Sequence, residues 1–140
     1  MPQSDFEKLR VYPLAEMLAD FIWEVVIKWD RLAQETVGRQ LINSADSIGA
    51  NIAEGSGRGS FADNRSFARI ARGSLLEVKH WLRRAYNRKL LSEAEVARLS
   101  EVIDELTPKL SAYIKSIGKQ QGGKVQPSPH RNKENNPDDN

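Results

Sequence analysis

The sequence predicts an all-α protein, an antiparallel up-down-up-down bundle of four helices followed by a disordered C-terminal tail. Three observations support this prediction. Apolar residues recur with the helical period of 3.6 in four segments, no segment shows the two-residue alternation of a β-strand, and the segments are joined by short polar or glycine-containing stretches, which favour antiparallel neighbours. The length of 140 residues, with 39% hydrophobic and 29% charged residues, suits a single domain with one core.

The first helix is expected over about residues 13–29, because Pro13 suits a first helical position and apolar residues then follow the i, i+3, i+4, i+7 template. An acidic row lies on its outer face at successive i+4 steps: Glu16, Asp20 and Glu24. Lys28 is placed to pair with the last of these. The second helix is expected over about residues 33–54. Gly49 lies inside it at a cost of about 1 kcal/mol relative to alanine, which indicates either a close approach of another backbone or a tolerated surface glycine.

The third helix is expected to begin at the capping-box pattern Ser60-x-x-Asp63 and to continue to about Lys89. Its inward face combines apolar and small residues: Phe67, Ile70, Ala71, Ser74, Leu75, Val78, Leu82 and Ala85. The glycine-rich stretch 55–59 that precedes it lacks the strand and the lysine of a phosphate-binding P-loop. It is therefore interpreted as a helix–helix turn, although an anion could rest on the free amides at the start of the third helix, beside Arg58.

The fourth helix opens with a second capping box, Ser92 to Glu95, and ends near residue 118. Pro108 lies inside it and predicts a kink near Thr107. The bundle domain is thus expected over residues 1–118. Residues 119–140 are rich in Gly, Pro, Asn, Gln and charge, a composition that buries too little apolar surface to order a chain, and they are expected to form a disordered polar tail.

Composition excludes several classes of protein. No cysteine is present, which excludes disulfides, thiol catalysis and thiolate metal sites. No apolar run approaches the ~20 residues of a membrane helix, and the N-terminus lacks the basic and apolar regions of a signal peptide. These features predict a cytoplasmic protein without a membrane partner.

No catalytic or metal-binding constellation is found. His80 and His130 are the only histidines, and neither has a second ligand at i+4, so no metal site is predicted. Serines and carboxylates are plentiful, but a hydrolytic triad lacks a histidine partner. The sequence therefore predicts no enzyme, no cofactor and no small-molecule substrate.

Positive charge is concentrated in the third helix. Residues 58–89 contain nine Lys and Arg against two Asp and Glu, whereas the counts are five against nine in residues 1–57 and three against five in residues 90–118. At about 100° per residue, five of the nine fall within roughly 80° on the face opposite the apolar one: Arg65, Arg69, Arg72, Lys79 and Arg83. With Arg58 they are the candidate nucleic-acid-binding residues, because rows of basic side chains neutralise phosphates. Two alternatives stay open, a contact with the acidic row of a neighbouring subunit and a plain solvated face.

Four polar residues at helix edges predict a hydrogen-bonded network between the second and third helices, with Arg58 as a further candidate member. They are Asn51, Glu54, Ser74 and Glu77. Such a network is expected to fix helix register or an interface rather than to perform chemistry.

The chain resembles a known family at Asn51-Ile52-Ala53-Glu54-Gly55, with Ala45-Asp46-Ser47-Ile48 before this run and Gly57-Arg58 after it. The match continues through Phe67, the run Ile70-Ala71-Arg72-Gly73-Ser74-Leu75 and Glu77, and it opens at Phe6, Leu9 and Val11. The family is that of the bacterial four-helix-bundle proteins first noticed as open reading frames in intervening sequences of 23S ribosomal RNA genes. The resemblance covers residues 6–118.

This resemblance implies a ring-like homopentamer with no established enzymatic activity. The family is similar in fold to the accessory variability protein of diversity-generating retroelements, a basic pentamer that supports a reverse transcriptase and contacts nucleic acid. By that analogy the chain is expected to bind RNA, DNA or a reverse transcriptase; the alternative is a structural or scaffold homo-oligomer without nucleic-acid affinity. The recurring residues of the family carry over as fold or interface residues: Asn51, Glu54, Gly55, Arg58, Phe67, Ser74 and Glu77.

Overall fold

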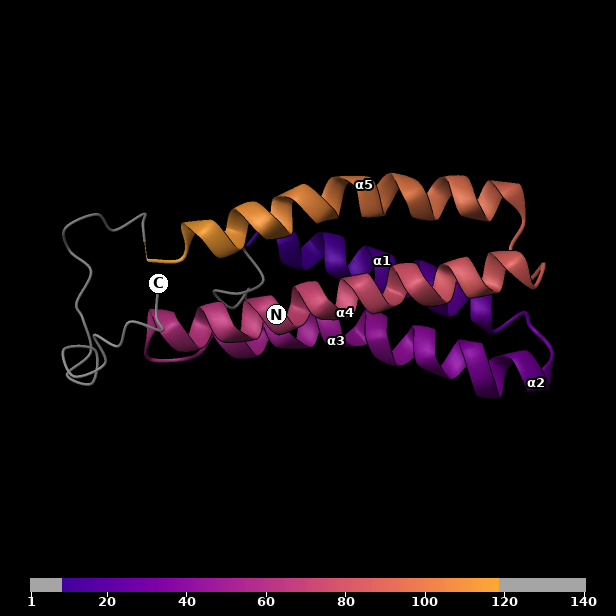
Figure 1. Ribbon diagram of the computed structural model, residues 1–140, viewed down its shortest axis with the longest axis horizontal. Helices are drawn as coiled ribbons and strands as arrows, with labels where there is room; N and C mark the ends of the chain where they lie inside the picture. Colours follow the sequence, from indigo (N-terminus) through magenta and orange to yellow (C-terminus); the bar gives the residue numbers. More distant parts are fainter. Residues whose placement is uncertain (1–8, 119–140) are drawn as a thin grey trace, which may run out of the picture.

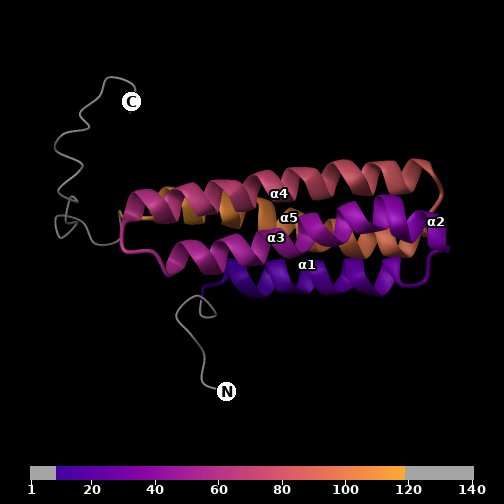
Figure 2. The same cartoon turned by 90° about the horizontal axis from the view of Figure 1, so that it is seen from below.

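A computed structural model describes residues 9–118, which form four helical rods lying side by side along one long axis (Figures 1 and 2). The first rod is α1 (Val11–Val26). The second is continuous and contains α2 (Arg31–Ala33), the π-helical turn η2 (Gln34–Gly38) and α3 (Arg39–Ser56). The third is α4 (Phe61–Asn87) and the fourth is α5 (Glu93–Ser116). The four-helix, all-α prediction is confirmed for these residues, and successive rods run in opposite directions in Figure 1. The expected tail, residues 119–140, lies outside the described residues.

Side-chain caps set where three of the rods begin. Asp30 accepts a hydrogen bond from the amide of Ala33 at 3.0 Å, so the second rod begins at residue 31, two residues before the prediction. The Ser60 hydroxyl accepts from the amide of Asp63 at 3.2 Å, which is one of the two bonds of the predicted capping box. The box at Ser92 is complete, because the Glu95 carboxylate also accepts from the Ser92 amide at 2.9 Å. The first rod ends at Val26, three residues before the predicted end.

The core is formed by one apolar stripe from each rod. Its largest fully buried side chains are Leu18, Ile22, Leu41, Ile48, Ile52, Leu75, Val78, Leu106 and Leu110. One residue predicted on the inward face of the third helix is wrong: Ile70 is 52% exposed. It lies about 100° from the centre of the buried stripe of α4, beyond the edge that meets α3.

Close backbone approach occurs at Gly55 rather than at Gly49. A Cβ added to Gly49 would lie at 3.5 Å from the Tyr12 ring, an ordinary contact. A Cβ added to Gly55 would lie at 2.8 Å from both the Cβ of Phe67 and the side-chain oxygen of Asn64. The end of α3 therefore packs against the beginning of α4 at a distance that leaves no room for a side chain.

Helix α5 continues through Pro108 without a break. The ribbon changes direction near its middle (Figure 1), so the predicted kink takes the form of a bend. The Thr107 hydroxyl donates to the carbonyl of Ile103 at 2.8 Å, a bond that bends helices further. None of the described helices is both long and apolar enough to cross a membrane.

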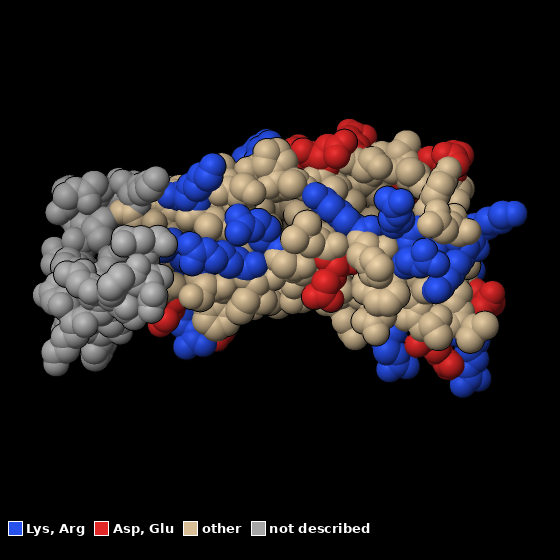
Figure 3. All heavy atoms as spheres, in the orientation of Figure 1, with Lys and Arg blue, Asp and Glu red and all other residues tan. Residues whose placement is uncertain are grey.

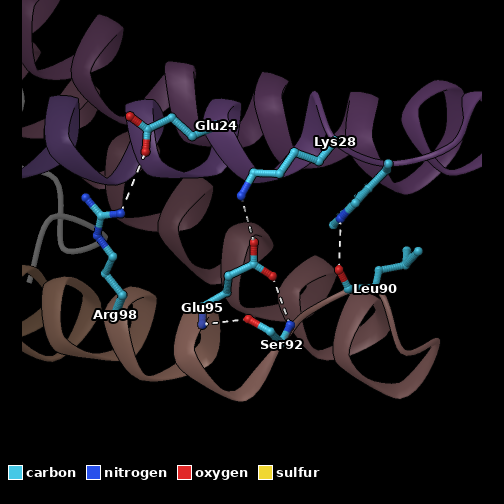
Figure 4. Close-up of polar contacts among 7 residues, drawn as sticks. Glu24, Lys28, Leu90, Ser92, Glu95 and Arg98 are labelled. Carbon is cyan, nitrogen blue, oxygen red and sulfur yellow. Dashed lines mark hydrogen bonds and ion pairs between the residues drawn. The ribbon is translucent and has the colours of Figure 1, made fainter.

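Helices α1 and α5 are joined by charged and polar contacts (Figure 4). The Glu24 carboxylate lies 3.8 Å from the Arg98 guanidinium, and the Lys28 ammonium lies 3.5 Å from the Glu95 carboxylate. The predicted pairing of Glu24 with Lys28 is wrong, because each residue finds its partner on α5. Beyond them, the indole of Trp29 donates to the carbonyl of Leu90 at 2.9 Å.

Candidate nucleic-acid interface

The outer face of α4 carries basic side chains, which Figure 3 shows in blue along the middle of the molecule. The opposite face of this helix is buried: Ala68, Ala71, Ser74, Leu75, Val78 and Ala85. Burial of that face fixes the rotation of α4 about its axis, and the rotation keeps the basic face toward solvent. From Arg65 to Arg83 the face extends over about 27 Å at the helical rise.

Four of the six predicted nucleic-acid-binding residues are not ion-paired. Arg69, Arg72 and Arg83 are exposed and Lys79 is half-buried. Within residues 9–118 none of the four forms an ion pair, whereas five cations elsewhere do: Lys28, Arg31, Arg58, Arg98 and Lys109. We call Arg69, Arg72, Lys79 and Arg83 the basic row.

The other two predicted residues make contacts inside the chain. Arg65 is half-buried and donates to the carbonyl of Ile117 at 3.2 Å, next to the C-terminal end of α5, where the helix dipole favours a cation. Arg58 lies 2.8 Å from the Glu54 carboxylate, and its guanidinium lies 4.8 Å from the centre of the Phe67 ring. Both arginines therefore have partners that compete with an external phosphate.

A cleft of about 480 Å³ opens between α4 and α5 beside the C-terminal half of the basic row. Leu82, Leu99 and Ile103 supply apolar lining, and the last two are buried. Lys79 and Arg83 line the cleft from the α4 side. The basic row thus borders an apolar hollow rather than a flat surface.

Tyr86 lines the same cleft and was not identified from the sequence. It is 47% exposed, and its hydroxyl donates to the Glu93 carboxylate at 3.1 Å. This hydrogen bond, with the negative charge of Glu93, raises the pKa of the Tyr86 phenol above its usual value. The signal that could have found it is spacing, because Tyr86 follows Arg83 at i+3 and Lys79 at i+7 and therefore shares their face.

A second groove, of about 320 Å³, lies between α1 and α3 and is acidic. Its carboxylates are Glu16, Asp20 and Asp46, over small residues that include Ala15, Ala19, Ala45 and Gly49. Burial, and then the charge of Asp20, raises the pKa of the Asp46 carboxyl above its usual value. Glu24, the third residue of the predicted acidic row, is paired with Arg98 instead, and Asp46 of α3 lines the groove with Glu16 and Asp20. No cation of the described residues pairs with the three groove carboxylates.

The described residues contain no group of three His, Cys, Asp or Glu side chains that could hold a metal ion. His80 is exposed, and its ring meets that of Trp81 edge-on at a centroid distance of 4.8 Å. His130 lies outside the described residues.

Comparison with known proteins identifies the family. The family model described as 23S rRNA-intervening sequence protein matches residues 7–112. The chain belongs to this family. A solved structure of similar fold is a protein of unknown function from the S23 ribosomal protein family of Bacteroides thetaiotaomicron VPI-5482, with a TM-score of 0.66 and 22% identity over 75% of this chain and 98% of that one. At that identity the likeness supports the fold alone. No curated protein matches the chain.

The residues by which the chain resembles the 23S rRNA intervening-sequence family lie mainly where α3 meets α4. Ser47 and Ser74 share a hydrogen bond of 2.8 Å, and the Asn51 amide donates to the Ser47 carbonyl at 2.8 Å and to its hydroxyl at 2.9 Å. Ser44 donates to the Glu77 carboxylate at 3.4 Å. Asn51 and Ser74 are therefore joined through Ser47, as predicted, whereas Glu77 makes a separate contact with Ser44.

Glu54 and Arg58 are not joined to this network by any hydrogen bond within the described residues; they pair with each other. Together with Gly55 and Phe67, they hold the end of α3 against the beginning of α4. In this member of the 23S rRNA intervening-sequence family, those motif residues thus make helix–helix contacts, and the basic row lies on another face of α4.

Proposed function

We propose that this chain is a non-enzymatic binding protein that holds nucleic acid through the basic row of α4. The difference in pairing carries the proposal: five cations elsewhere in residues 9–118 have carboxylate partners, whereas the four cations of the basic row, Arg69, Arg72, Lys79 and Arg83, have none among the described residues. Unpaired cations spaced along one rigid helix provide several phosphate contacts, and the backbone that carries them is already ordered before binding.

The row suits recognition of a phosphate backbone rather than of a base sequence. Its four members span about 21 Å at the helical rise. Arginine and lysine contacts to phosphate fix position without reading sequence. The proposed activity is therefore binding with weak sequence preference, driven by the release of counterions.

A salt titration tests this function. Binding of a fluorescein-labelled single-stranded RNA is measured by anisotropy at increasing potassium chloride concentrations. Four phosphate contacts on a single strand give a slope of log K against log salt of about −2.8. The double variant Arg69→Gln/Arg72→Gln should weaken binding and reduce the slope to about −1.4.

The control removes the same charge elsewhere. Arg31 and Arg39 are exposed and lie on the α2–α3 rod, outside the basic row, so Arg31→Gln/Arg39→Gln should leave the slope unchanged. An equal loss in both double variants would show a general charge effect. Absence of RNA binding by the wild type at low salt would refute the nucleic-acid function.

The acidic groove between α1 and α3 favours a second candidate, a structural or scaffold homo-oligomer without nucleic-acid affinity. Trp23 and Ile27, which follow Glu16 and Asp20 on the same helix face, are 55% and 54% exposed. Exposed apolar side chains beside unpaired carboxylates suit a protein contact, and the basic row of a second copy is complementary in charge. Homopentamer formation is proposed for both candidates, and a reverse-transcriptase partner for the basic row of the first candidate, on the strength of the family resemblance alone.

Charge reversal separates the two candidates. The variant Arg69→Glu/Arg72→Glu is examined by light scattering and by RNA binding. Loss of the oligomer would assign the row to subunit contact. Loss of RNA binding with an intact oligomer would assign it to nucleic acid. Wild-type protein that is a monomer by light scattering would refute the scaffold candidate.

A further inference from the structure

The cleft between α4 and α5 combines an apolar lining with polar rims of opposite character. Lys79 and Arg83 stand on the α4 side, and Ser100 and Asp104 stand on the α5 side. Within the described residues, Asp104 forms no ion pair with either cation. The volume of the cleft, about 480 Å³, lies within the range of small-ligand sites.

Tyr86 gives this cleft an aromatic surface. Its hydroxyl is tied to Glu93 at the first turn of α5, across the connection between the two helices. The tie restrains the ring, while 47% of the residue stays accessible to solvent. A restrained, accessible aromatic ring next to unpaired cations is the combination with which proteins stack bases of single-stranded nucleic acid.

We infer that the cleft binds an unpaired base of a single-stranded nucleic acid. The base stacks on Tyr86, and the phosphates on either side of it contact Lys79 and Arg83. The inference rests on the proposed function and deepens it, because it adds a preference for single strands. In a duplex both faces of every base are stacked on neighbours, so a base can enter only after it is unpaired. The basic row alone carries no such preference, since both duplexes and single strands present phosphates.

On the α5 side of the cleft, Asp104 is placed to form a hydrogen bond with the edge of the base. A carboxylate such as that of Asp104 accepts hydrogen bonds, and the exocyclic amino groups of adenine, cytosine and guanine donate them. Uracil has no exocyclic amino group and presents only its N3–H as a donor. The cleft should therefore favour bases with an exocyclic amino group over uracil.

Tyr86 variants test the inference. Affinities of the full chain for labelled oligoadenylate and for an RNA duplex of the same length are compared at one salt concentration. Tyr86→Ala should lower the affinity for oligoadenylate by roughly 5- to 100-fold, the range of one base–aromatic stack. Its salt slope and its duplex affinity should stay at the wild-type values. Tyr86→Phe keeps the ring and loses only the hydrogen bond to Glu93, so its affinity for oligoadenylate should stay within about twofold of wild type.

Failure of this inference and failure of the proposed function give different results. If Arg69→Gln/Arg72→Gln weakens binding while Tyr86→Ala binds oligoadenylate as the wild type does, the cleft binds no base. The proposed function of the basic row would then be retained. If the wild type binds neither probe, both are refuted. An equal loss of single-strand and duplex affinity in Tyr86→Ala would also overturn the base site. Circular dichroism of both Tyr86 variants confirms that the helices are retained.

Asp104→Ala gives a second readout. It should reduce the preference for oligoadenylate over oligouridylate by about fivefold, the effect of one base-edge hydrogen bond. The preference that remains comes from the stronger stacking of adenine. An unchanged preference would contradict the assigned role of Asp104. Equal wild-type affinity for the two oligonucleotides would contradict it as well.

Discussion

The two long sides of α4 are built differently. Toward α3, the helix approaches so closely that Gly55 has no room for a Cβ, and the Ser47–Ser74 hydrogen bond of 2.8 Å joins the two helices. Toward α5, the same helix borders a cleft of about 480 Å³ lined in part by unpaired cations. The closed side contains most of the residues that carry the family resemblance, and the open side contains half of the basic row, Lys79 and Arg83. The difference indicates that α4 uses one side to fix the fold and leaves the other available to a ligand.

The closed side should be sensitive to a single added side chain. Gly55→Val forces a branched side chain against Phe67 and Asn64, and overpacking of this kind should lower the free energy of unfolding by about 3 kcal/mol. Urea denaturation measures it as a lower midpoint with an unchanged slope.

The matched control for Gly55 is Gly73→Val, in the middle of α4. A Cβ at Gly73 has no atom within 4 Å, so this variant should stay within about 0.5 kcal/mol of the wild type. Equal losses at the two glycines would show that the close approach at Gly55 does not stabilise the bundle.

The hydrogen bond across the closed side should have a smaller effect. Ser74 is only 6% exposed, and Ser74→Ala removes its bond to Ser47, which keeps a bond to Asn51. Because no buried group is left without a partner, the expected loss is about 1 kcal/mol. Ser66→Ala, at an exposed position of the same helix, should change the free energy of unfolding by less than about 0.5 kcal/mol. A loss above 2 kcal/mol at Ser74 would mean that the wider network depends on this one bond.

The start of α5, at the end of the open side, should be stabilised in a pH-dependent way. Hydrogen bonds from Ser92, followed by the charge of Lys28, hold the pKa of the Glu95 carboxyl below its usual 4.5 despite partial burial. A depressed pKa means that the folded state favours the ionised form, so this stabilisation is complete above the unfolded pKa and is lost as pH falls through the folded pKa.

Glu95→Gln should therefore lower the free energy of unfolding by about 0.5–1 kcal/mol at neutral pH. The difference from wild type should shrink as the pH falls from the usual 4.5 through the lowered pKa of Glu95, which urea titrations at several pH values measure. Glu101→Gln, an exposed position on α5, is the control and should show no such trend. A Glu95→Gln difference that is constant with pH would contradict the assigned role of the carboxylate.

The fold could be predicted from the sequence because its signals are local. The periodic apolar residues and the two serine caps depend on neighbours within a few residues, and the structure confirms them. The errors lie at helix edges. Ile70 fits the helical period but lies beyond the contact with α3, and the partner of Lys28 lies on α5 rather than one turn away. Both errors come from tertiary neighbours that periodicity cannot supply.

The candidate site could be predicted only in part, for the same reason. Charge segregation and helical spacing identified the basic row from sequence. They could not show that Arg65 reaches the end of α5 or that Arg58 pairs with Glu54. The cleft beside Tyr86 depends on how far α5 stands from α4, which is a property of two helices distant in the sequence.

The smallest expected effect on stability belongs to the basic row, and it sharpens the comparison most. Arg69→Gln/Arg72→Gln removes two cations that pair with no carboxylate among the described residues, so the free energy of unfolding should change by less than about 0.5 kcal/mol. Relief of repulsion along the row favours a slight gain at low ionic strength, which added salt would remove. The same urea titration at low and high salt measures both effects.

A decrease of more than about 1 kcal/mol in the free energy of unfolding of this variant would show that the basic row stabilises the fold. The row would then not differ from the closed side. Unchanged stability together with weakened RNA binding would instead separate the two sides by function. Residues whose charge repels its neighbours and adds nothing to stability are expected where a ligand supplies the missing counter-charge. On the closed side of α4, by contrast, the side chains themselves supply the contacts, so a substitution there should change the free energy of unfolding before it changes binding.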